Sequence, residues 1–207
     1  MSVGTGGRTA VTRALFRIGA LRFGKFRLAS GKTSSYYLDL RLLPSDVEAY
    51  TLSIEAYLSI ARKIGEKEFD VVAGVATAGV TISSPLAYLM KKPMVYVRSE
   101  EKGHGLQKRV EGAILPRSRV LLIDDLATTG GSLVSAVEAL RGQGSVVKEA
   151  AVLVDRLEGG RAALSAVGVR LWSFVDVREL VSTLFQERKV TKGDMEAVLE
   201  QIGGMAR

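Results

Sequence analysis

The sequence predicts an α/β protein with a doubly wound, mostly parallel sheet, flanked by helices and joined to a small N-terminal subdomain. Short runs rich in Val, Ile and Leu alternate along the chain with segments of helical periodicity. The runs are apolar throughout rather than at every second position, which is typical of parallel strands buried on both faces. A length of 207 residues fits one domain with small additions.

The expected core elements follow in a β-α order that indicates a doubly wound sheet. The expected strands are Asp70–Val75, Pro93–Val97, Arg119–Asp124, Lys148–Val154 and Val169–Phe174. Apolar residues at spacings of three or four predict helices at Val47–Gly65, Gly131–Gly142 and Arg161–Gly168.

The two ends differ from this core. Arg8–Ile18 has a helical pattern, and Phe23–Arg41 is typical of a loop or hairpin that ends in a strand, Tyr36–Arg41. Met195–Ile202 predicts a short last helix, and a helical pair covering the sheet is our default expectation for residues 176–207. We therefore divide a single domain, 1–207, into an N-terminal segment (1–45), an α/β core (46–175) and C-terminal helices (176–207).

Composition excludes several kinds of chemistry and leaves others open. Without cysteine, the chain has no cysteine nucleophile, zinc ribbon or iron–sulfur site. No apolar run reaches the roughly 18–20 residues that span a bilayer, and the first residues lack the apolar segment of a signal peptide. We expect a cytoplasmic protein with no membrane partner. The absence of Asn and the low Gln content fit a hot-adapted source.

The chain carries 29 Lys and Arg against 22 Asp and Glu, a formal net charge of +7. Such an excess suits a nucleic acid, an acidic membrane surface or a small polyanion as partner, but it also suits a basic surface without one. The positions of the charges have to decide between these alternatives.

The strongest motif joins a buried strand to a polar turn. Four apolar residues precede the adjacent acids Asp124 and Asp125, and a Thr-Thr-Gly-Gly-Ser turn opens the next helix. Ligands of open α/β sheets bind outside the carboxyl ends of the strands. Backbone N–H groups at a helix N-terminus suit a phosphate, and paired carboxylates suit ribose hydroxyls or a hydrated divalent cation. The alternative is that Asp125 only starts a loop and Ser132 only caps a helix.

This motif resembles the signature of the type I phosphoribosyltransferases, which bind phosphoribosyl pyrophosphate. The resemblance implies the fold of that family, with the two acids on the ribose hydroxyls and the turn around the 5-phosphate. It assigns to this binding Asp124, Asp125, Leu126, Ala127, Thr128, Thr129, Gly130, Gly131 and Ser132. It also places the pyrophosphate at the backbone of Ala76 and Thr77, although small residues are common in any β-α turn.

Three further segments resemble the orotate phosphoribosyltransferases within that family. Residues 98–105 resemble their catalytic loop, with Arg98, Lys102 and His104 in register and Ser99 in place of a lysine. The resemblance implies catalytic and phosphoribosyl-pyrophosphate-binding roles for these three residues, and a catalytic role for the two acids. It also implies a loop that closes over the neighbouring subunit of a homodimer. Otherwise, such a charged loop is a solvated hairpin.

Orotate is expected to lie against Tyr36, Tyr37, Thr128 and Arg156. The two tyrosines match aromatics that flank the pyrimidine in the family, although Ala29 stands where many members have a lysine. Arg156 follows a strand, and a guanidinium binds a carboxylate through two parallel hydrogen bonds. The alternatives are strand tyrosines that face core and surface, and an arginine in a surface ion pair.

The resemblance implies transfer of phosphoribosyl to N1 of orotate, in pyrimidine biosynthesis, with Mg²⁺ held mainly by substrate and only indirectly by Asp124 and Asp125. Both substrates are small anions, which explains part of the net charge, and we expect no nucleic-acid partner. The alternatives are a purine phosphoribosyltransferase and a regulator on the same fold that senses phosphoribosyl pyrophosphate. A loop with Lys102 and His104 favours catalysis, because a sensor does not need one.

Overall fold

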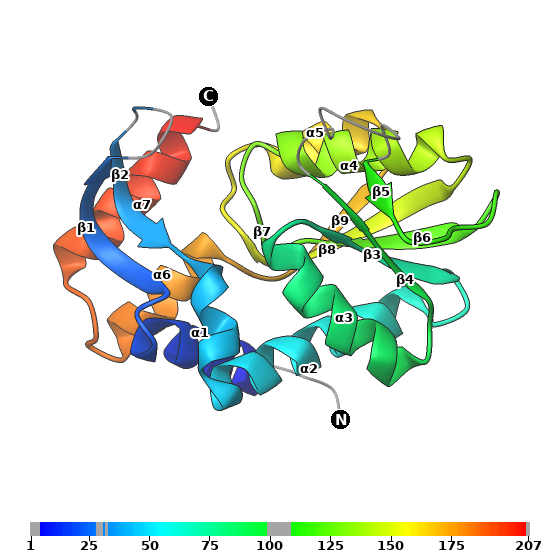
Figure 1. Ribbon diagram of the computed structural model, residues 1–207. Helices are drawn as coiled ribbons and strands as arrows, with labels where there is room; N and C mark the ends of the chain where they lie inside the picture. Colours follow the sequence, from blue (N-terminus) through cyan, green and yellow to red (C-terminus); the bar gives the residue numbers. More distant parts are fainter. Residues whose placement is uncertain (1–4, 28–30, 32, 99–108, 206–207) are drawn as a thin grey trace.

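The computed structural model describes residues 5–27, 31, 33–98 and 109–205, and its helices and strands alternate through the core (Figure 1). The first elements are α1 (Thr5–Arg17), β1 (Leu21–Arg27), β2 (Thr33–Leu38), the 3-10 helix η1 (Leu40–Ser45), α2 (Val47–Ile64), β3 (Val71–Val75), α3 (Ala78–Met90) and β4 (Met94–Val97). The others are β5 (Val110–Glu111), β6 (Arg119–Ile123), β7 (Leu126–Ala127), α4 (Gly131–Gly142), β8 (Val146–Asp155), α5 (Gly160–Ala166), β9 (Arg170–Asp176), α6 (Val177–Gln186) and α7 (Lys192–Met205).

The central sheet has the order β5-β4-β3-β6-β8, with β9 on the outer side of β8 and β7 beside the last residues of β8. All pairs are parallel except that of β4 with the short β5. The expected mostly parallel sheet is therefore confirmed, and the five expected strands agree with β3, β4, β6, β8 and β9 to within about two residues. The two-residue strands β5 and β7 were not expected, because so short a run carries no pattern.

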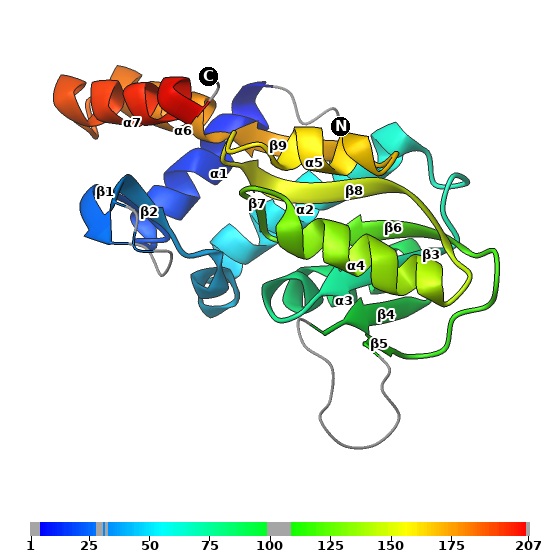
Figure 2. The same ribbon diagram turned by 90° about the horizontal axis from the view of Figure 1, so that it is seen from above.

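Helices cover both faces of this sheet, as Figures 1 and 2 show, with α2 and α3 on one face and α4 and α5 on the other. All five residues of β3 are buried, which accounts for its continuous apolar sequence. One cluster of buried side chains joins the sheet to α2 and α3, and a second joins it to α4 and α5. The doubly wound core is thus closed on both faces. Among the described residues, no helix is long and apolar enough to cross a membrane.

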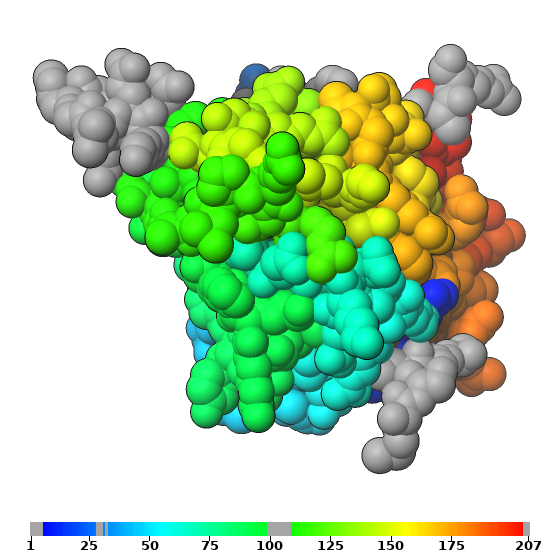
Figure 3. Space-filling view, turned by 90° about the vertical axis from the view of Figure 1, so that its right-hand side faces the viewer, coloured from blue at the N-terminus to red at the C-terminus, as the bar shows by residue number. Residues whose placement is uncertain are grey.

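The antiparallel hairpin β1–β2 forms a second, two-stranded sheet beside the core. The expected strand Tyr36–Arg41 is wrong at its end, because β2 stops at Leu38 and Asp39 begins η1 by accepting a hydrogen bond from the backbone N–H of Arg41. We call the hairpin together with α1, α6 and α7 the hood. In the view of Figure 3 the core faces the reader, and part of the orange and red C-terminal helices shows at its edge.

The C-terminal helices correct our expectation of a pair that covers the central sheet. Figure 1 shows α7 against the hairpin rather than over the core. Val198 and Ile202 of α7 are buried, and Gln201 Oε1 accepts a hydrogen bond of 2.8 Å from the backbone N–H of Ser35 in β2. The last 30 or so residues therefore complete the N-terminal hairpin in space, because a two-stranded sheet needs a packing partner.

Candidate active site

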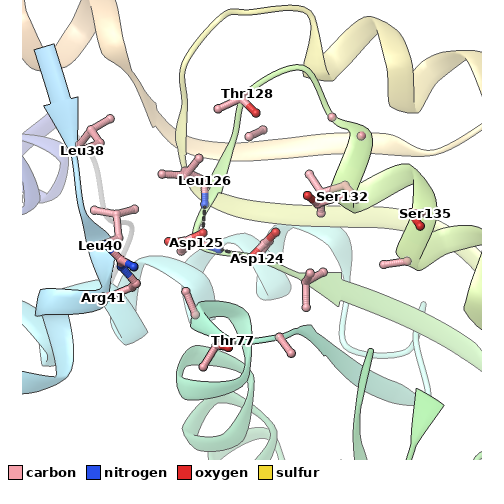
Figure 4. Close-up of a pocket in the computed structure, with 18 of the residues that line it drawn as sticks. Leu38, Leu40, Arg41, Thr77, Asp124, Asp125, Leu126, Thr128, Ser132 and Ser135 are labelled. Atoms are coloured by element: carbon pink, nitrogen blue, oxygen red, sulfur yellow. Dashed lines mark hydrogen bonds between the residues drawn. The ribbon is translucent and has the colours of Figure 1, made fainter. Parts of the chain in front are cut away.

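A cleft of about 690 Å³ opens where the central strands β3 and β6 end, between η1 and the first turn of α4 (Figure 4). It lies at the carboxyl edge of the parallel sheet, where ligands of such folds bind. Its lining comes from four segments, which are Leu38–Arg41, Val75–Ala78, Asp124–Thr128 with Gly130–Leu133, and Arg109 with Ser135 and Ala136.

Asp124 and Asp125 lie in the middle of the cleft, in the break between β6 and β7. The Asp125 N–H donates to Asp124 Oδ1 at 2.9 Å, and the Leu126 N–H donates to Asp125 Oδ1 at 2.8 Å. Burial raises the pKa of both carboxyl groups, and the neighbouring Asp125 charge raises that of Asp124 further. Among the described residues, no lysine or arginine forms an ion pair with either acid. The pair therefore suits hydroxyl donors or a hydrated cation, either of which would stabilise its charge.

Tyr57 of α2 contacts the backbone of the break between β6 and β7 that carries the two acids. The Tyr57 hydroxyl is buried and donates a hydrogen bond of 2.6 Å to the backbone carbonyl of Asp124. Burial raises the pKa of this hydroxyl well above its ordinary value, so it remains a donor. Periodicity placed Tyr57 on the apolar stripe of its helix, but no sequence signal tied it to the acids.

The turn from Thr128 to Ser132 curves against the start of α5. Gly130 has a positive φ of 87°, and the Gly160 N–H donates to the carbonyl of Thr128 at 2.8 Å. A side chain at Gly160 would meet that carbonyl oxygen at 2.8 Å, so the close approach requires glycine. The alternative that Ser132 caps α4 is wrong, because the N-cap is Gly130. A glycine has no capping side chain, and the first-turn N–H groups remain suited to a phosphate.

The turn between β3 and α3 faces the same cleft. Its Ala76–Thr77 peptide bond is cis, and the Ala76 N–H donates to the carbonyl of Val97 at 2.8 Å. Thr77 is the N-cap of α3 but makes no side-chain capping bond. A side chain at Gly79 would meet the carbonyl oxygen of Ile123 at 2.6 Å, so glycine lets the start of α3 approach the end of β6. The structure thus brings the Ala76–Thr77 turn to the acids, as expected.

Of the catalytic-loop cations expected at the cleft, Arg98 is the one that the structure describes. Arg98 directly follows β4 and pairs with Glu111 at 3.4 Å, and it is not among the residues that line the cleft. Lys102, His104 and Ser99 lie outside the described residues. Arg41 and Arg109 do line the cleft. Sequence reasoning missed both, because neither stands in a motif that marks a ligand contact.

The residues expected to bind orotate separate into two groups. Thr128 lines the cleft, but Tyr36, Tyr37 and Arg156 do not. Strand alternation directs Tyr36 into the core and Tyr37 outward, where its ring centroid lies 5.6 Å from that of Phe26.

Arg156 points toward the hood and is buried. Its Nε donates to the Tyr36 hydroxyl at 3.0 Å, and its Nη2 lies 2.8 Å from Glu158 Oε1. That nitrogen makes an ion pair with Glu158 but no well-aligned hydrogen bond. Burial raises the pKa of Tyr36 to about 12, against the opposing effect of the Arg156 charge. The Arg156–Glu158 pair thus joins the core to the hood through Tyr36.

The doubly wound sheet, the paired acids and the two N–H-rich turns define a phosphoribosyltransferase. Residues 47–169 match the family model described as the phosphoribosyl transferase domain, which is more than half of the chain.

Comparison with known proteins places the chain more closely. It is 42% identical to an orotate phosphoribosyltransferase of Staphylothermus marinus over 85% of each chain. The crystal structure of the orotate phosphoribosyltransferase of Aeropyrum pernix matches at 38% identity, covers 85% of this chain and 98% of its own, and has a TM-score of 0.79. That of Mycobacterium tuberculosis in complex with 5-phospho-alpha-D-ribosyl 1-diphosphate matches at 26% identity and a TM-score of 0.67, over 84% of this chain and 98% of its own. The chain belongs to the orotate phosphoribosyltransferase family.

Proposed function

We propose that this chain transfers a phosphoribosyl group from phosphoribosyl pyrophosphate to N1 of orotate, giving orotidine 5-phosphate and pyrophosphate in pyrimidine biosynthesis. The observation that carries the proposal is the acid pair, with Asp124 buried and Asp125 partly buried, which lies between two turns that suit phosphate groups in one cleft. Relatives about 40% identical over most of the chain are named for this activity.

The cleft offers one segment for each part of phosphoribosyl pyrophosphate. Asp124 and Asp125 would accept hydrogen bonds from the two ribose hydroxyls, which relieves the cost of holding buried charge. The turn from Ala127 to Ser132 and the start of α4 would bind the 5-phosphate through backbone N–H groups. The Ala76–Thr77 turn would bind the pyrophosphate in the same way.

Mg²⁺ fits this site as an ion held mainly by the substrate. The described residues contain no cluster of three or more His, Asp or Glu that could enclose a metal. The described carboxylates that line the cleft are Asp124, Asp125 and Asp39, and Asp39 is already paired with Arg41. A magnesium ion commonly keeps several waters and uses one or two carboxylates with substrate phosphates. When bound, Mg²⁺ supplies positive charge beside the pyrophosphate oxygens.

The reaction breaks the bond between the anomeric carbon and the pyrophosphate oxygen and forms a bond to N1 of orotate, which loses its proton. Positive charge develops on the ribose, and negative charge develops on the leaving group. Asp124 and Asp125 orient the ribose, and their negative charge favours the developing cation. Arg98, Lys102 and His104 would stabilise the leaving pyrophosphate. His104 would donate a hydrogen bond or proton, since an ordinary histidine pKa is about 6.5.

The orotate carboxylate would bind Arg156, with Thr128 and the aromatic residues Tyr36 and Tyr37 nearby. In the structure Glu158 holds the Arg156 guanidinium at 2.8 Å, so orotate would have to take the place of this carboxylate. The proposal includes a homodimer in which Lys102 and His104 act at the neighbouring subunit. We therefore expect Lys102→Ala to slow turnover far more than it weakens the binding of orotate.

The direct test is the loss of orotate absorbance when phosphoribosyl pyrophosphate and Mg²⁺ are added to the purified protein. We expect turnover with orotate and none with adenine, guanine or hypoxanthine. Asp125→Asn serves as the inactive control, because it keeps the shape of the cleft and removes a charge. Turnover with a purine but not with orotate would overturn the proposal, and so would binding of phosphoribosyl pyrophosphate without any transfer.

A further inference from the structure

Arg109 is a charged residue of the cleft that no motif and no step of the proposed reaction has used. It precedes β5, its side chain is half-buried, and it lines the same cleft as Thr77 and Asp124. A charge in that position contributes to the electrostatic potential that any anionic ligand of the cleft meets.

Neutral acceptors hold the Arg109 guanidinium in place. Its Nη1 donates to Ser135 Oγ of α4 at 2.9 Å and also lies 3.5 Å from the Ser135 carbonyl oxygen. Its Nε and Nη2 donate to the backbone carbonyl of Arg98 at 3.4 and 3.3 Å. A guanidinium has five N–H donors, so these four contacts leave at least one for a ligand. Three of the four are also long enough to exchange readily.

No described carboxylate pairs with Arg109, which distinguishes it from the other arginine of the cleft. Arg41 Nε lies 2.7 Å from Asp39 Oδ1, so its charge is already neutralised. Among the described residues that line the cleft, Arg109 is therefore the arginine whose charge is free to act on a ligand. A partly buried cation without a counterion favours an anion more strongly than one in bulk water.

Strand order places the backbone of Arg109 on the side of the cleft where the Ala76–Thr77 turn lies, and its guanidinium reaches from there to Ser135 of α4. The Arg98 N–H donates to the carbonyl of Arg109 at 2.8 Å, and the Ala76 N–H donates to the carbonyl of the preceding Val97 at 2.8 Å. Arg109 is thus separated from the Ala76–Thr77 turn by one strand, β4, along the same edge of the sheet. The Thr128–Ser132 turn follows β6 and β7, on the other side of β3.

We propose that Arg109 binds the pyrophosphate group of phosphoribosyl pyrophosphate together with the Ala76–Thr77 turn. The inference rests on the proposed function and adds a residue to that site. The charge on pyrophosphate rises as its bond to ribose breaks, so a fixed guanidinium stabilises the departing group more than the bound substrate. Ser135 and the end of β4 orient the guanidinium before the ligand arrives.

The test compares Arg109→Gln with Arg141→Gln in the full chain. Arg141 is a matched control because it also donates to backbone carbonyls, those of Val147 and Val167, but it stands at the far end of α4. Calorimetric titrations with inorganic pyrophosphate and with ribose 5-phosphate, each with Mg²⁺, separate the two ends of the cleft. A charged hydrogen bond of the usual strength predicts a loss of pyrophosphate affinity of roughly ten- to hundredfold in Arg109→Gln. Ribose 5-phosphate affinity should stay within about twofold, and Arg141→Gln should bind both ligands like the wild type.

Arg109→Lys separates charge from scaffolding, because it keeps the cation but cannot reproduce the guanidinium contacts with Ser135 and Arg98. We expect it to bind pyrophosphate more tightly than Arg109→Gln. Equal losses in both variants, or equal losses for both ligands, would identify Arg109 as a structural clamp and overturn the inference. Unchanged pyrophosphate binding in Arg109→Gln would overturn it too. A wild-type protein that binds neither ligand would instead contradict the proposed function itself.

Discussion

Asp124 and Asp125 in the cleft occupy electrostatic surroundings opposite to those of the acids around the hood, whereas Asp39 of the same cleft is paired with Arg41. Around the hood, three arginines of α1 each face a carboxylate, in the pairs Arg8–Glu179, Arg13–Glu187 and Arg17–Asp46. The hydrogen bond from Arg17 lowers the pKa of Asp46 to about 2. In the cleft, burial raises the pKa of Asp124 and Asp125, and no lysine or arginine of the described part of the chain pairs with either acid.

The paired carboxylates around the hood stabilise the folded protein slightly, whereas burial of Asp124 and Asp125 lowers its stability. Exposed pairs with good geometry add a little to stability and lose it in salt. A buried acid without a cation costs stability, and it persists in a sequence only where something other than stability selects it. The contrast thus locates the site independently of any motif.

The largest expected effect comes from neutralising one cleft acid. Asp124→Asn should reduce kcat/KM for phosphoribosyl pyrophosphate by roughly a hundred- to a thousandfold, because charged hydrogen bonds to the ribose are lost. The same change should raise the Tm of the free protein at neutral pH, since the buried charge disappears. If Asp124→Asn lowered both activity and Tm, the claim that the buried charge of Asp124 lowers stability would be wrong.

The sign of the pH dependence follows from the raised pKa. Between the unfolded pKa of about 3.9 and the higher folded value, the native carboxyl binds more protons than the unfolded one, so stability falls as pH rises. The Tm advantage of Asp124→Asn should therefore be absent below about pH 4 and grow toward neutral pH. A pH series of thermal unfolding curves, measured without ligand, checks this directly.

The next largest effect is expected where α3 meets the acids. In Gly79→Ala the new methyl group would lie 2.6 Å from the carbonyl oxygen of Ile123, so the helix must shift away from β6. Overpacking of this kind costs about 1–3 kcal/mol, and the shift should also lower affinity for pyrophosphate. Gly142→Ala is the matched control, because its methyl group would meet nothing within 4 Å. Denaturant unfolding of both variants measures the difference, and equal stabilities would contradict the close contact.

A smaller effect is expected from the hydroxyl beneath the acid pair. Tyr57→Phe leaves the Asp124 carbonyl without its buried donor, which costs about 1–3 kcal/mol of stability and loosens the strand break. Turnover should fall severalfold with little change in the KM for orotate. Tyr50→Phe provides the control on the same helix, since its hydroxyl donates to the carbonyl of Thr81. If both variants change turnover equally, Tyr57 has no specific part in positioning the acids.

The smallest effect belongs to the hood. Arg17→Ala removes an exposed pair with Asp46 and should barely alter Tm or activity at physiological salt. Because the folded pKa of Asp46 is lowered to about 2, any contribution from this pair is present above the unfolded pKa and lost as pH falls toward 2. Thermal unfolding at pH 7 and pH 3 compares the two conditions. A large loss of Tm at pH 7 would contradict the view that the exposed ion pairs of the hood contribute little to stability.

The five expected strands of the core and the acid-bearing turn were predictable because each is a local pattern. Continuous apolar runs specify strands covered on both faces, and the order of small and hydroxyl residues after Asp125 marks a helix start that faces a phosphate. The end of β2 was not predictable, since Asp39 terminates the strand through a hydrogen bond to the backbone of Arg41. The packing of α7 against the hairpin was not predictable either, because the apolar face of a helix does not specify which element it will pack against.

The sequence by itself determined the class of fold, the position of the acids and the two N–H-rich turns, because these depend on residues adjacent in the chain. Only the tertiary structure decided that Tyr36 packs against Arg156 inside the protein, that Tyr57 supports Asp124, and that Arg109 rather than Arg98 lines the cleft. The physical reason is that burial and pairing set the electrostatic role of each side chain. Both are properties of neighbours distant in sequence.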